Sequence, residues 1–416
     1  MRLTSRVLLC LSLSPLIASC DDSTPATPDA PPVTPDAPSG VQYPAIAETF
    51  GDTIDPENLP NYAHQAIPTY IRKDNSLSNP QTDTGATLGR VLFYDKKLSV
   101  TETIACATCH QQKHAFSDPA IASQGANGAT GRHAMRLVNA RFGLESRFFW
   151  DRRAPSLEFQ TTQPIQNHTE MGYSGVNGDP SLADLITRLQ AIPYYQELFT
   201  IAFGDSTITE ERMQIAMAQF VRSIQSFDSR YDANRVLVTD DRGPFPNFTA
   251  QENAGLSLFM GRSVFDDAGN RTSGGVSCVA CHSAPEFDID PNLAGNNGVV
   301  GSLSGTGFDI VVNRAPTLRD LIDPDGALNS PLMHTGEFTS LQGVFAHYNS
   351  ISISADNPNL DARLIQGTDE VPVGQQLHIT PNEAAALAAF LRTLTGQNVY
   401  TDKKWGDPFP KVEPGQ

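Results

Sequence analysis

Two short stretches determine how this chain of 416 residues folds: residues 106–110 read CATCH, and residues 278–282 read CVACH. Each follows the pattern Cys-x-x-Cys-His, the attachment signature of a c-type haem. Two thiols one helical turn apart can form thioethers with the two vinyl groups of one porphyrin, and the next His supplies an axial nitrogen. A zinc half-site needs four converging ligands, and a redox dithiol does not require the His. Two copies predict two covalently bound haem c groups, held by Cys106, Cys109, His110, Cys278, Cys281 and His282.

The N-terminus has the features of a bacterial export signal. Residues 1–6 carry two arginines, and residues 7–18 form an apolar stretch that is too short to span a bilayer. The small residues before Cys20 resemble a bacterial lipobox. We expect a signal peptide over residues 1–19 and a lipidated Cys20 that anchors the protein to a membrane in the bacterial periplasm. The alternative is cleavage elsewhere, which leaves Cys20 as a free thiol.

The cysteine count agrees with this assignment. Of six cysteines, Cys10 lies in the signal peptide, Cys20 takes lipid and four take haem, so none remains for a disulfide. Covalent haem attachment occurs outside the cytoplasmic membrane in bacteria, so the export signal and the haem motifs are consistent. Residues 20–40 are rich in proline and lack large apolar side chains, which predicts an extended tether.

The chain is acidic, with a formal net charge of −17. Haem propionates would add further negative charge. This balance argues against nucleic acid as a partner and permits electrostatic steering of a basic electron-donor protein.

A local repeat precedes the two haem motifs. Residues 89–93 and 255–259 both read Gly-x-x-Leu-Phe, and Phe116 and Phe287 follow the motifs. We interpret this as a duplication and expect a mainly α fold with two cytochrome c-like domains, each wrapping one covalently bound haem with long loops. The expected boundaries are an N-terminal haem domain over residues 41–240, a C-terminal haem domain over residues 241–396 and a tail over residues 397–416.

Helix-capping residues mark three further segments. Ser181 precedes a stretch with leucines on one face, and Thr209 precedes a stretch whose apolar residues recur at helical spacing. Residues 380–383 read TPNE, a capping box with Pro at the first helical position, and we expect Gly396 to close that helix.

Other patterns bear on the core and the loops. Met213 and Met217 lie at helical spacing, which favours core positions over iron ligation. Residues 295–307 are rich in Gly and Asn and are expected to form a surface loop. Alternating patterns typical of strands are scarce.

Three further blocks carry a family resemblance: residues 149–171 read FWDRRAPSLEFQTTQPIQNHTEM, residues 314–319 read RAPTLR, and residues 331–336 read PLMHTG. With the paired haem motifs, they resemble the bacterial di-haem cytochrome c peroxidase and MauG superfamily over roughly residues 80 to 396. The resemblance implies that the haem on His110 reacts with hydrogen peroxide, with Gln160 and Glu170 in its distal pocket. A carboxylate there can accept a proton from H₂O₂ and return it. Trp150 matches the tryptophan between the two haem groups; packing in the core is the alternative for it.

The haem on His282 would be the electron-transfer haem, and its sixth ligand distinguishes the branches of the superfamily. The position of the peroxidase Met falls on Tyr348, and MauG-type enzymes also have Tyr there. A phenolate is a hard anionic donor that should lower the haem potential. We therefore expect Tyr348 to ligate the second iron. Met333 and His347 are its rivals, and simple packing of Tyr348 is the other alternative.

The chain departs from the family pattern in two places. The peroxidases have a loop His that ligates the first haem at rest, but residues 122–127 contain none, and His114 and His133 are displaced from that position. We expect the first haem to be five-coordinate without reductive activation. The family also binds one Ca²⁺ through an Asn, and this position falls on His133, with Asn329 and Pro331 as the matching carbonyl donors. Imidazole is a poor Ca²⁺ ligand, and Asn139 is the possible substitute, so the site stays open.

The sequence therefore favours an oxidoreductase of the cytochrome c peroxidase type, which takes electrons from a small redox protein such as a cytochrome c or a cupredoxin. The alternative is a MauG-like enzyme that uses H₂O₂ to oxidise residues of a partner protein. Tyr348 and the missing loop His favour that alternative. A reading of another class is a non-catalytic di-haem electron carrier, in which both irons are fully ligated and Gln160 and Glu170 have no purpose.

Overall fold

The computed structural model describes residues 42–144, 147–288, 294–303 and 307–410. Residues 43–416 form one compact unit. The predicted signal peptide, Cys20 and the tether lie outside the described residues. Within the described ranges, no helix is both long enough and apolar enough to cross a membrane.

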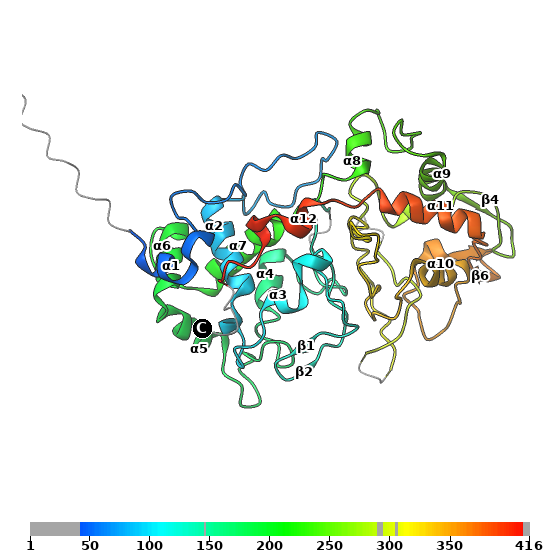
Figure 1. Ribbon diagram of the computed structural model, residues 1–416. Coiled ribbons are helices and arrows are strands. Elements are labelled where there is room, and N and C mark those ends of the chain that lie inside the picture. Colours follow the sequence, from blue (N-terminus) through cyan, green and yellow to red (C-terminus); the bar gives the residue numbers. More distant parts are fainter. Residues whose placement is uncertain (1–41, 145–146, 289–293, 304–306, 411–416) are drawn as a thin grey trace, which may run out of the picture. The chain divides into compact units, whose positions relative to one another are not determined.

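The described part of the chain is rich in helices and has few strands, as the scarcity of alternating patterns predicts (Figure 1). Three antiparallel hairpins, each of two strands, account for its named strands. The hairpins are β1 (Gln124–Gly125) with β2 (Gly128–Ala129), β3 (Ser263–Phe265) with β4 (Arg271–Gly274), and β5 (Ile365–Gly367) with β6 (Pro372–Gly374). The α-helices are α1 (Pro44–Phe50), α2 (Asp83–Tyr94), α3 (Cys106–Cys109), α4 (Leu157–Thr162), α5 (Leu182–Gln190), α6 (Pro193–Phe203), α7 (Glu210–Ser223), α8 (Arg230–Arg235), α9 (Ala250–Met260), α10 (Leu341–Asn349), α11 (Pro381–Arg392) and α12 (Asn398–Thr401).

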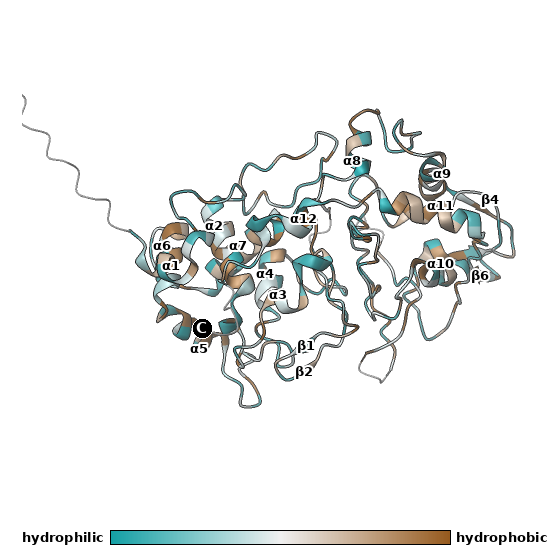
Figure 2. Cartoon of the chain, viewed as in Figure 1, coloured by the Kyte–Doolittle hydropathy of each residue, from teal (hydrophilic) through white to brown (hydrophobic). Residues whose placement is uncertain are grey.

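The capping residues begin the helices where the sequence predicts. The side chains of Ser181, Thr209 and Thr380 accept hydrogen bonds from the first turns of α5, α7 and α11. These bonds satisfy backbone N–H groups that have no partner within the helix. The predicted end of α11 is wrong by a few residues, because the helix stops at Arg392 and the Gly396 N–H is bound instead by the buried Asp320 carboxylate at 2.9 Å. Figure 2 shows both apolar and polar residues along α10 and α11.

Two helix pairs repeat the same packing, with α2 against α7 and α9 against α11 (Figure 1). In the first pair, a Cβ on Gly89 would lie 2.0 Å from the backbone oxygen of Ala216. In the second pair, a Cβ on Gly255 would lie 2.0 Å from the backbone oxygen of Ala386. Each crossing is therefore close enough that only glycine fits, and both glycines belong to the Gly-x-x-Leu-Phe repeat.

An aromatic cluster accompanies each helix pair. The ring centroid of Phe93 lies 6.1 Å from that of Phe116 and 5.1 Å from that of Phe220. In the second pair, the corresponding rings are Phe259, Phe287 and Phe390, with centroids 5.2–6.0 Å apart. The repeat seen in the sequence is thus a repeat of packing around each haem motif.

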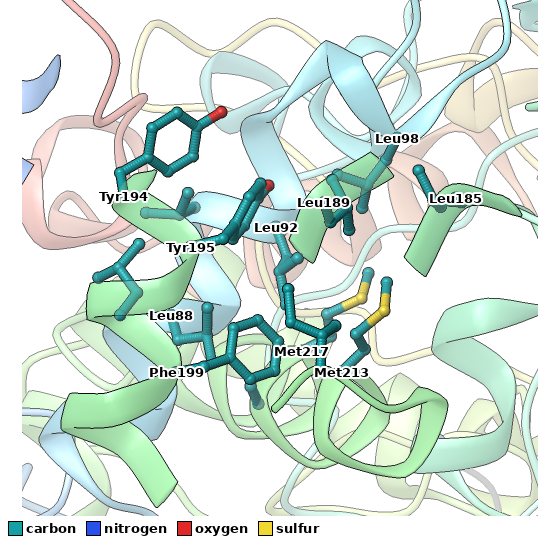
Figure 3. Close-up of a cluster of buried hydrophobic side chains, with 14 of the residues drawn as sticks. Leu88, Leu92, Leu98, Leu185, Leu189, Tyr194, Tyr195, Phe199, Met213 and Met217 are labelled. Atoms are coloured by element: carbon teal, nitrogen blue, oxygen red, sulfur yellow. The ribbon is translucent and has the colours of Figure 1, made fainter. Parts of the chain in front are cut away.

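Buried side chains of α2, α5, α6 and α7 form an apolar core in the N-terminal half. Met213 and Met217 are 0% and 2% exposed, and Figure 3 shows them among the leucine and aromatic side chains of this cluster. They are core residues, as their spacing predicts.

The segment after α11 packs against the first half of the chain. Trp405 is 2% exposed within a cluster that contains Phe93, Phe116 and Phe220. The backbone oxygen of Trp405 accepts a hydrogen bond from the Tyr94 hydroxyl at 2.7 Å. The last described residues therefore cover the helix pair next to the first haem motif.

Candidate active site

The first haem motif begins on α3 and places His110 directly after the helix. The His110 backbone N–H donates to the Cys106 carbonyl at 2.9 Å, and Nδ1 of the ring lies 3.1 Å from the Phe116 carbonyl oxygen. This carbonyl fixes the proton on Nδ1, so the lone pair of Nε2 is available to a metal. Burial lowers the pKa of His110, which keeps the ring neutral.

The second motif repeats this arrangement in a short 3₁₀ turn over Cys278–Ala280. The His282 backbone N–H donates to the Cys278 carbonyl at 2.9 Å, and Nδ1 lies 3.3 Å from the Phe287 carbonyl oxygen. Burial lowers the pKa of His282 to about 4. Phe116 and Phe287 have positive φ angles of 61° and 57°, which are unfavourable for a residue with a bulky side chain. This backbone conformation directs their carbonyls to the two histidines.

Each motif faces a cavity, which we name the first and the second cavity. Cys109 and His110 line the first cavity, while Cys106 packs against the neighbouring apolar clusters. Cys278, Cys281 and His282 line the second cavity together with apolar side chains of α10 and α11. None of these four cysteines forms a disulfide. A neutral imidazole with a free nitrogen, in a motif of two thiols that faces a cavity, fits a covalently attached haem, and this chain has the motif twice. Apolar side chains predominate around the second cavity, whereas charged and amide side chains also line the first.

Gln160 and Glu170 both line the first cavity, as His110 does. Gln160 belongs to α4, and Glu170 belongs to the turn after it. Within the described residues, neither side chain has a hydrogen-bond partner, so an amide and a carboxyl are available to a small molecule. Burial raises the pKa of Glu170, and Arg153 lowers it to a smaller extent. A raised pKa brings a carboxyl closer to the pH range in which it can both accept and donate a proton.

The hairpin β1–β2 holds the backbone of Glu170 in place. The Ala126 N–H donates to the Glu170 carbonyl at 2.8 Å, and the Asn127 N–H donates to the Thr169 carbonyl at 3.1 Å. A Cβ on Gly125 would lie 2.2 Å from the Thr169 carbonyl oxygen. The loop His of the peroxidases is expected near residues 122–127, and in this chain that segment contains β1. Here the hairpin contacts the turn that carries Glu170.

The two displaced histidines have other partners. His133 is 4% exposed, its Nδ1 lies 3.0 Å from the Ala120 carbonyl oxygen and its Nε2 lies 3.4 Å from the Ser117 hydroxyl. Among the described residues, His114 does not line the first cavity. His133 itself lines the first cavity, and the five-coordinate first haem stays a prediction.

Trp150 lines both cavities. Its indole N–H donates to the His133 carbonyl at 2.7 Å, and its own carbonyl accepts from the Arg314 N–H at 2.8 Å. The His334 ring centroid lies 6.3 Å from the indole. Hydrogen bonds thus hold both the indole and the backbone of Trp150 between the two cavities.

An ion-pair bridge lies next to this tryptophan. Arg132 contacts Asp151 at 2.6 Å and Asp309 at 2.6 Å. The guanidinium holds the pKa of both carboxyls below the usual range, although burial opposes this. Asp151 follows Trp150 directly, so the bridge fixes this segment to the loop that carries Asp309.

Tyr348, on α10, lines the second cavity together with Met333, whereas His347 is not among the described residues that line it. Nε2 of His347 lies 2.9 Å from the Asn297 carbonyl oxygen, and Nδ2 of Asn297 lies 3.3 Å from Sδ of Met333. Burial raises the pKa of Tyr348, and a hydrogen bond with the Asn297 side chain lowers it to a smaller extent. The geometry therefore leaves Tyr348 and Met333 as ligand candidates.

Asn297 was missed by the sequence reasoning, because residues 295–307 were expected to form a surface loop. That expectation is wrong for the start of the segment, where Asn296 is 0% exposed and Asn297 lines the second cavity. The Asn296 side chain binds the backbone of Val311 at 3.0 Å and of Gly298 at 2.8 Å. Asn side chains that replace backbone partners allow such a loop to be buried. The adjacent Asn pair was the available signal.

The side chains of Asn139 and Asn329 contact the protein, whereas the carbonyl donors expected at Asn329 and Pro331 stay a prediction. Asn139 is bound to the backbone of Ser226 through both its oxygen, at 2.8 Å, and its nitrogen, at 3.2 Å. Nδ2 of Asn329 donates to the Asp320 carbonyl and the Tyr400 hydroxyl. Within the described residues, no three His, Cys, Asp or Glu side chains gather into a metal-binding group.

The chain is similar to known proteins over most of its length. Residues 83–239 match the family model described as di-haem cytochrome c peroxidase. The methylamine utilization protein MauG of Methylophilus methylotrophus is 30% identical over 77% of this chain and 85% of its own length. The cytochrome c551 peroxidase of Pseudomonas aeruginosa is 27% identical over 76% of this chain and 80% of its own length.

The fold also matches solved structures. A MauG-like protein associated with microbial copper homeostasis superposes with a TM-score of 0.61, at 26% identity, over 83% of this chain and 99% of its own. The di-haem peroxidase BthA from Burkholderia thailandensis has a TM-score of 0.58 at 22% identity, which shows the same fold. The membership of the family implies two haem groups, and the two cavities fit them. The chain belongs to the di-haem cytochrome c peroxidase and MauG superfamily of enzymes.

Proposed function

We propose that this enzyme reacts with hydrogen peroxide in the first cavity and passes electrons through a haem in the second cavity. The observation that carries this proposal is the first cavity itself, where an unpartnered carboxyl and an unpartnered amide share a space with the thiol and imidazole of a haem motif. A closed electron carrier would have no use for this pair.

The haem groups supply one-electron redox chemistry at iron when they are bound. In our proposal, His110 and His282 hold the irons and the four motif cysteines hold the porphyrins through thioethers, within two cytochrome c-like domains. Tyr348 is the proposed second axial ligand in the second cavity, and Met333 is its rival there.

Glu170 and Gln160 handle the substrate. Glu170 accepts a proton from one oxygen of H₂O₂ and returns it to the oxygen that departs as water, while the Gln160 amide donates a hydrogen bond that orients the peroxide. Complete reduction consumes two electrons and two protons and yields two molecules of water. Trp150, which lines both cavities, is the proposed route for the electrons.

The source of the two electrons separates the two versions of this function. In the peroxidase version, a small redox protein such as a cytochrome c or a cupredoxin delivers them. In the MauG-like version, they are withdrawn from residues of a partner protein. The position of Tyr348 in the second cavity favours the MauG-like version, because an anionic oxygen ligand stabilises oxidised iron.

Stopped-flow spectroscopy of the diferric protein with one equivalent of H₂O₂ tests the proposal. We expect a rapid reaction in the wild type and a rate about 10²- to 10⁴-fold lower in Glu170→Gln, because the amide cannot accept the proton. Glu211→Gln is the matched control, since Glu211 is an exposed glutamate of α7. Equal rates for Glu170→Gln and the wild type would refute the role of Glu170.

The same experiment with reduced donors distinguishes the two versions. A peroxidase oxidises two equivalents of a one-electron donor for each H₂O₂ consumed. A MauG-like enzyme leaves such donors largely reduced and modifies a partner protein instead, which mass spectrometry detects.

We also propose, from the sequence, that Cys20 carries a lipid anchor in the periplasm. Mass spectrometry of the mature N-terminus tests this, since a lipidated Cys20 would be the first residue. Calcium analysis of the purified protein tests the Ca²⁺ that the resemblance implies.

A further inference from the structure

Arg136, like Arg314, lines both cavities. Its Nη2 donates to the Thr317 carbonyl at 3.0 Å, and its Nε is buried without a hydrogen-bond partner among the described residues. No carboxylate of the described residues lies within ion-pair distance of it. Arg132 and Arg319, in contrast, contact carboxylates at 2.6 Å and 2.9 Å.

A buried guanidinium without an anion is unfavourable, because the charge loses its water and gains no opposite charge in return. Tyr400 and Asp320 act on Arg136 electrostatically, without a hydrogen bond or ion pair to it, and the Asp320 carboxylate is bound to the Gly396 N–H. Burial accordingly lowers the pKa of Arg136. The protein therefore presents an uncompensated cation to the two cavities.

We infer that Arg136 binds carboxylates of both porphyrins and is a cofactor-positioning residue shared by the two haem groups. This inference rests on the proposed function, in which each cavity holds a haem. Each porphyrin brings propionates that need a cation when they are buried. The planar fork of a guanidinium carries donors on several edges, so it can serve two carboxylates at once.

A fixed positive charge near two irons has a measurable consequence. It favours the reduced form of each iron, because ferrous haem carries one positive charge less than ferric haem. Removal of the charge should lower both midpoint potentials in a single variant.

The test is a spectroelectrochemical titration of the holoprotein, with Arg136→Gln compared with the wild type. At a fixed applied potential, we expect the ratio of reduced to oxidised haem to fall about tenfold for both haem groups, which is about 59 mV for a one-electron couple. Arg136→Lys keeps the charge and should restore most of the ratio. A pyridine haemochrome assay on each variant counts the haem groups.

Arg153→Gln is the matched control. Of the two cavities, Arg153 lines the first alone; it is paired with Asp151 at 2.9 Å and is half exposed. Its removal should therefore change the ratio of reduced to oxidised haem by less than about twofold for the first haem and leave this ratio unchanged for the second. If Arg136→Gln carries two haem groups and neither potential changes, the inference is wrong. If the wild type itself lacks two haem groups, the proposed function fails instead.

Arg136→His gives a second measurement if Arg136→Gln does not accumulate. An imidazole at this position loses its charge as the pH rises through about 6.5. Both potentials should then fall more steeply over this range than in the wild type. Equal slopes in Arg136→His and the wild type would overturn the inference.

Discussion

Gly125→Ala should slow the reaction with hydrogen peroxide without touching any group that carries chemistry. The new Cβ would lie 2.2 Å from the Thr169 carbonyl oxygen and 2.8 Å from Cα of Glu170. Relief of this overlap requires a separation of about 1 Å between the hairpin and the turn that carries Glu170. A displacement of this size at a catalytic group can cost roughly 100-fold in rate.

The assay is the stopped-flow reaction of the diferric protein with H₂O₂, followed in the Soret region. We expect the second-order rate constant of Gly125→Ala to fall by about 100-fold, with an unchanged number of haem groups per chain. The spectrum of the second haem should also be unchanged, because the hairpin does not line the second cavity.

Gly406→Ala is the control, since Gly406 is not among the residues that line either cavity and its Cβ would meet no atom closer than 3.3 Å. It should react at the rate of the wild type. If Gly125→Ala also reacts within about twofold of the wild type, then the position of the Glu170 turn does not control the reaction, and the reasoning from the first cavity is refuted.

Three other changes test separate parts of the molecule. Tyr348→Phe should abolish the low-spin EPR signal of the second haem, and an unchanged signal would reject Tyr348 as the ligand. Burial raises the pKa of Asp320 to about 6, so the folded state holds a proton that the unfolded chain releases, and stability falls as the pH rises from about 4 to 6. Asp320→Asn keeps the acceptor for the Gly396 N–H, so urea unfolding at neutral pH should show a gain of about 3 kcal/mol that disappears below pH ~4. Gly255→Ala places a Cβ 2.0 Å from the Ala386 carbonyl oxygen, which should cost about 1–3 kcal/mol of unfolding free energy against a helix-propensity gain of about 1 kcal/mol. Ser257 is exposed on the same helix, so Ser257→Ala raises helix propensity without a close contact to Ala386 and should not lower the free energy of unfolding.

Local patterns were sufficient for the helices and the haem motifs. A cap such as Ser181 or Thr380 acts on N–H groups within three residues of itself, so the sequence alone contains both partners. The Cys-x-x-Cys-His pattern is likewise local, because one porphyrin spans its two thiols. The Gly-x-x-Leu-Phe repeat indicated a duplicated unit for the same reason, although its purpose, the close helix crossing at Gly89 and Gly255, depends on distant partners.

The tertiary structure alone decided which distant groups meet. It joined Asn297 to His347, which lies 50 residues further along the chain and next to Tyr348. It also left Arg136 without an anion beside two cavities. Such contacts join residues far apart in the chain, and their energies depend on burial and on backbone angles that no local pattern encodes. The sequence therefore determined which groups this protein holds, and the fold determined what surrounds them.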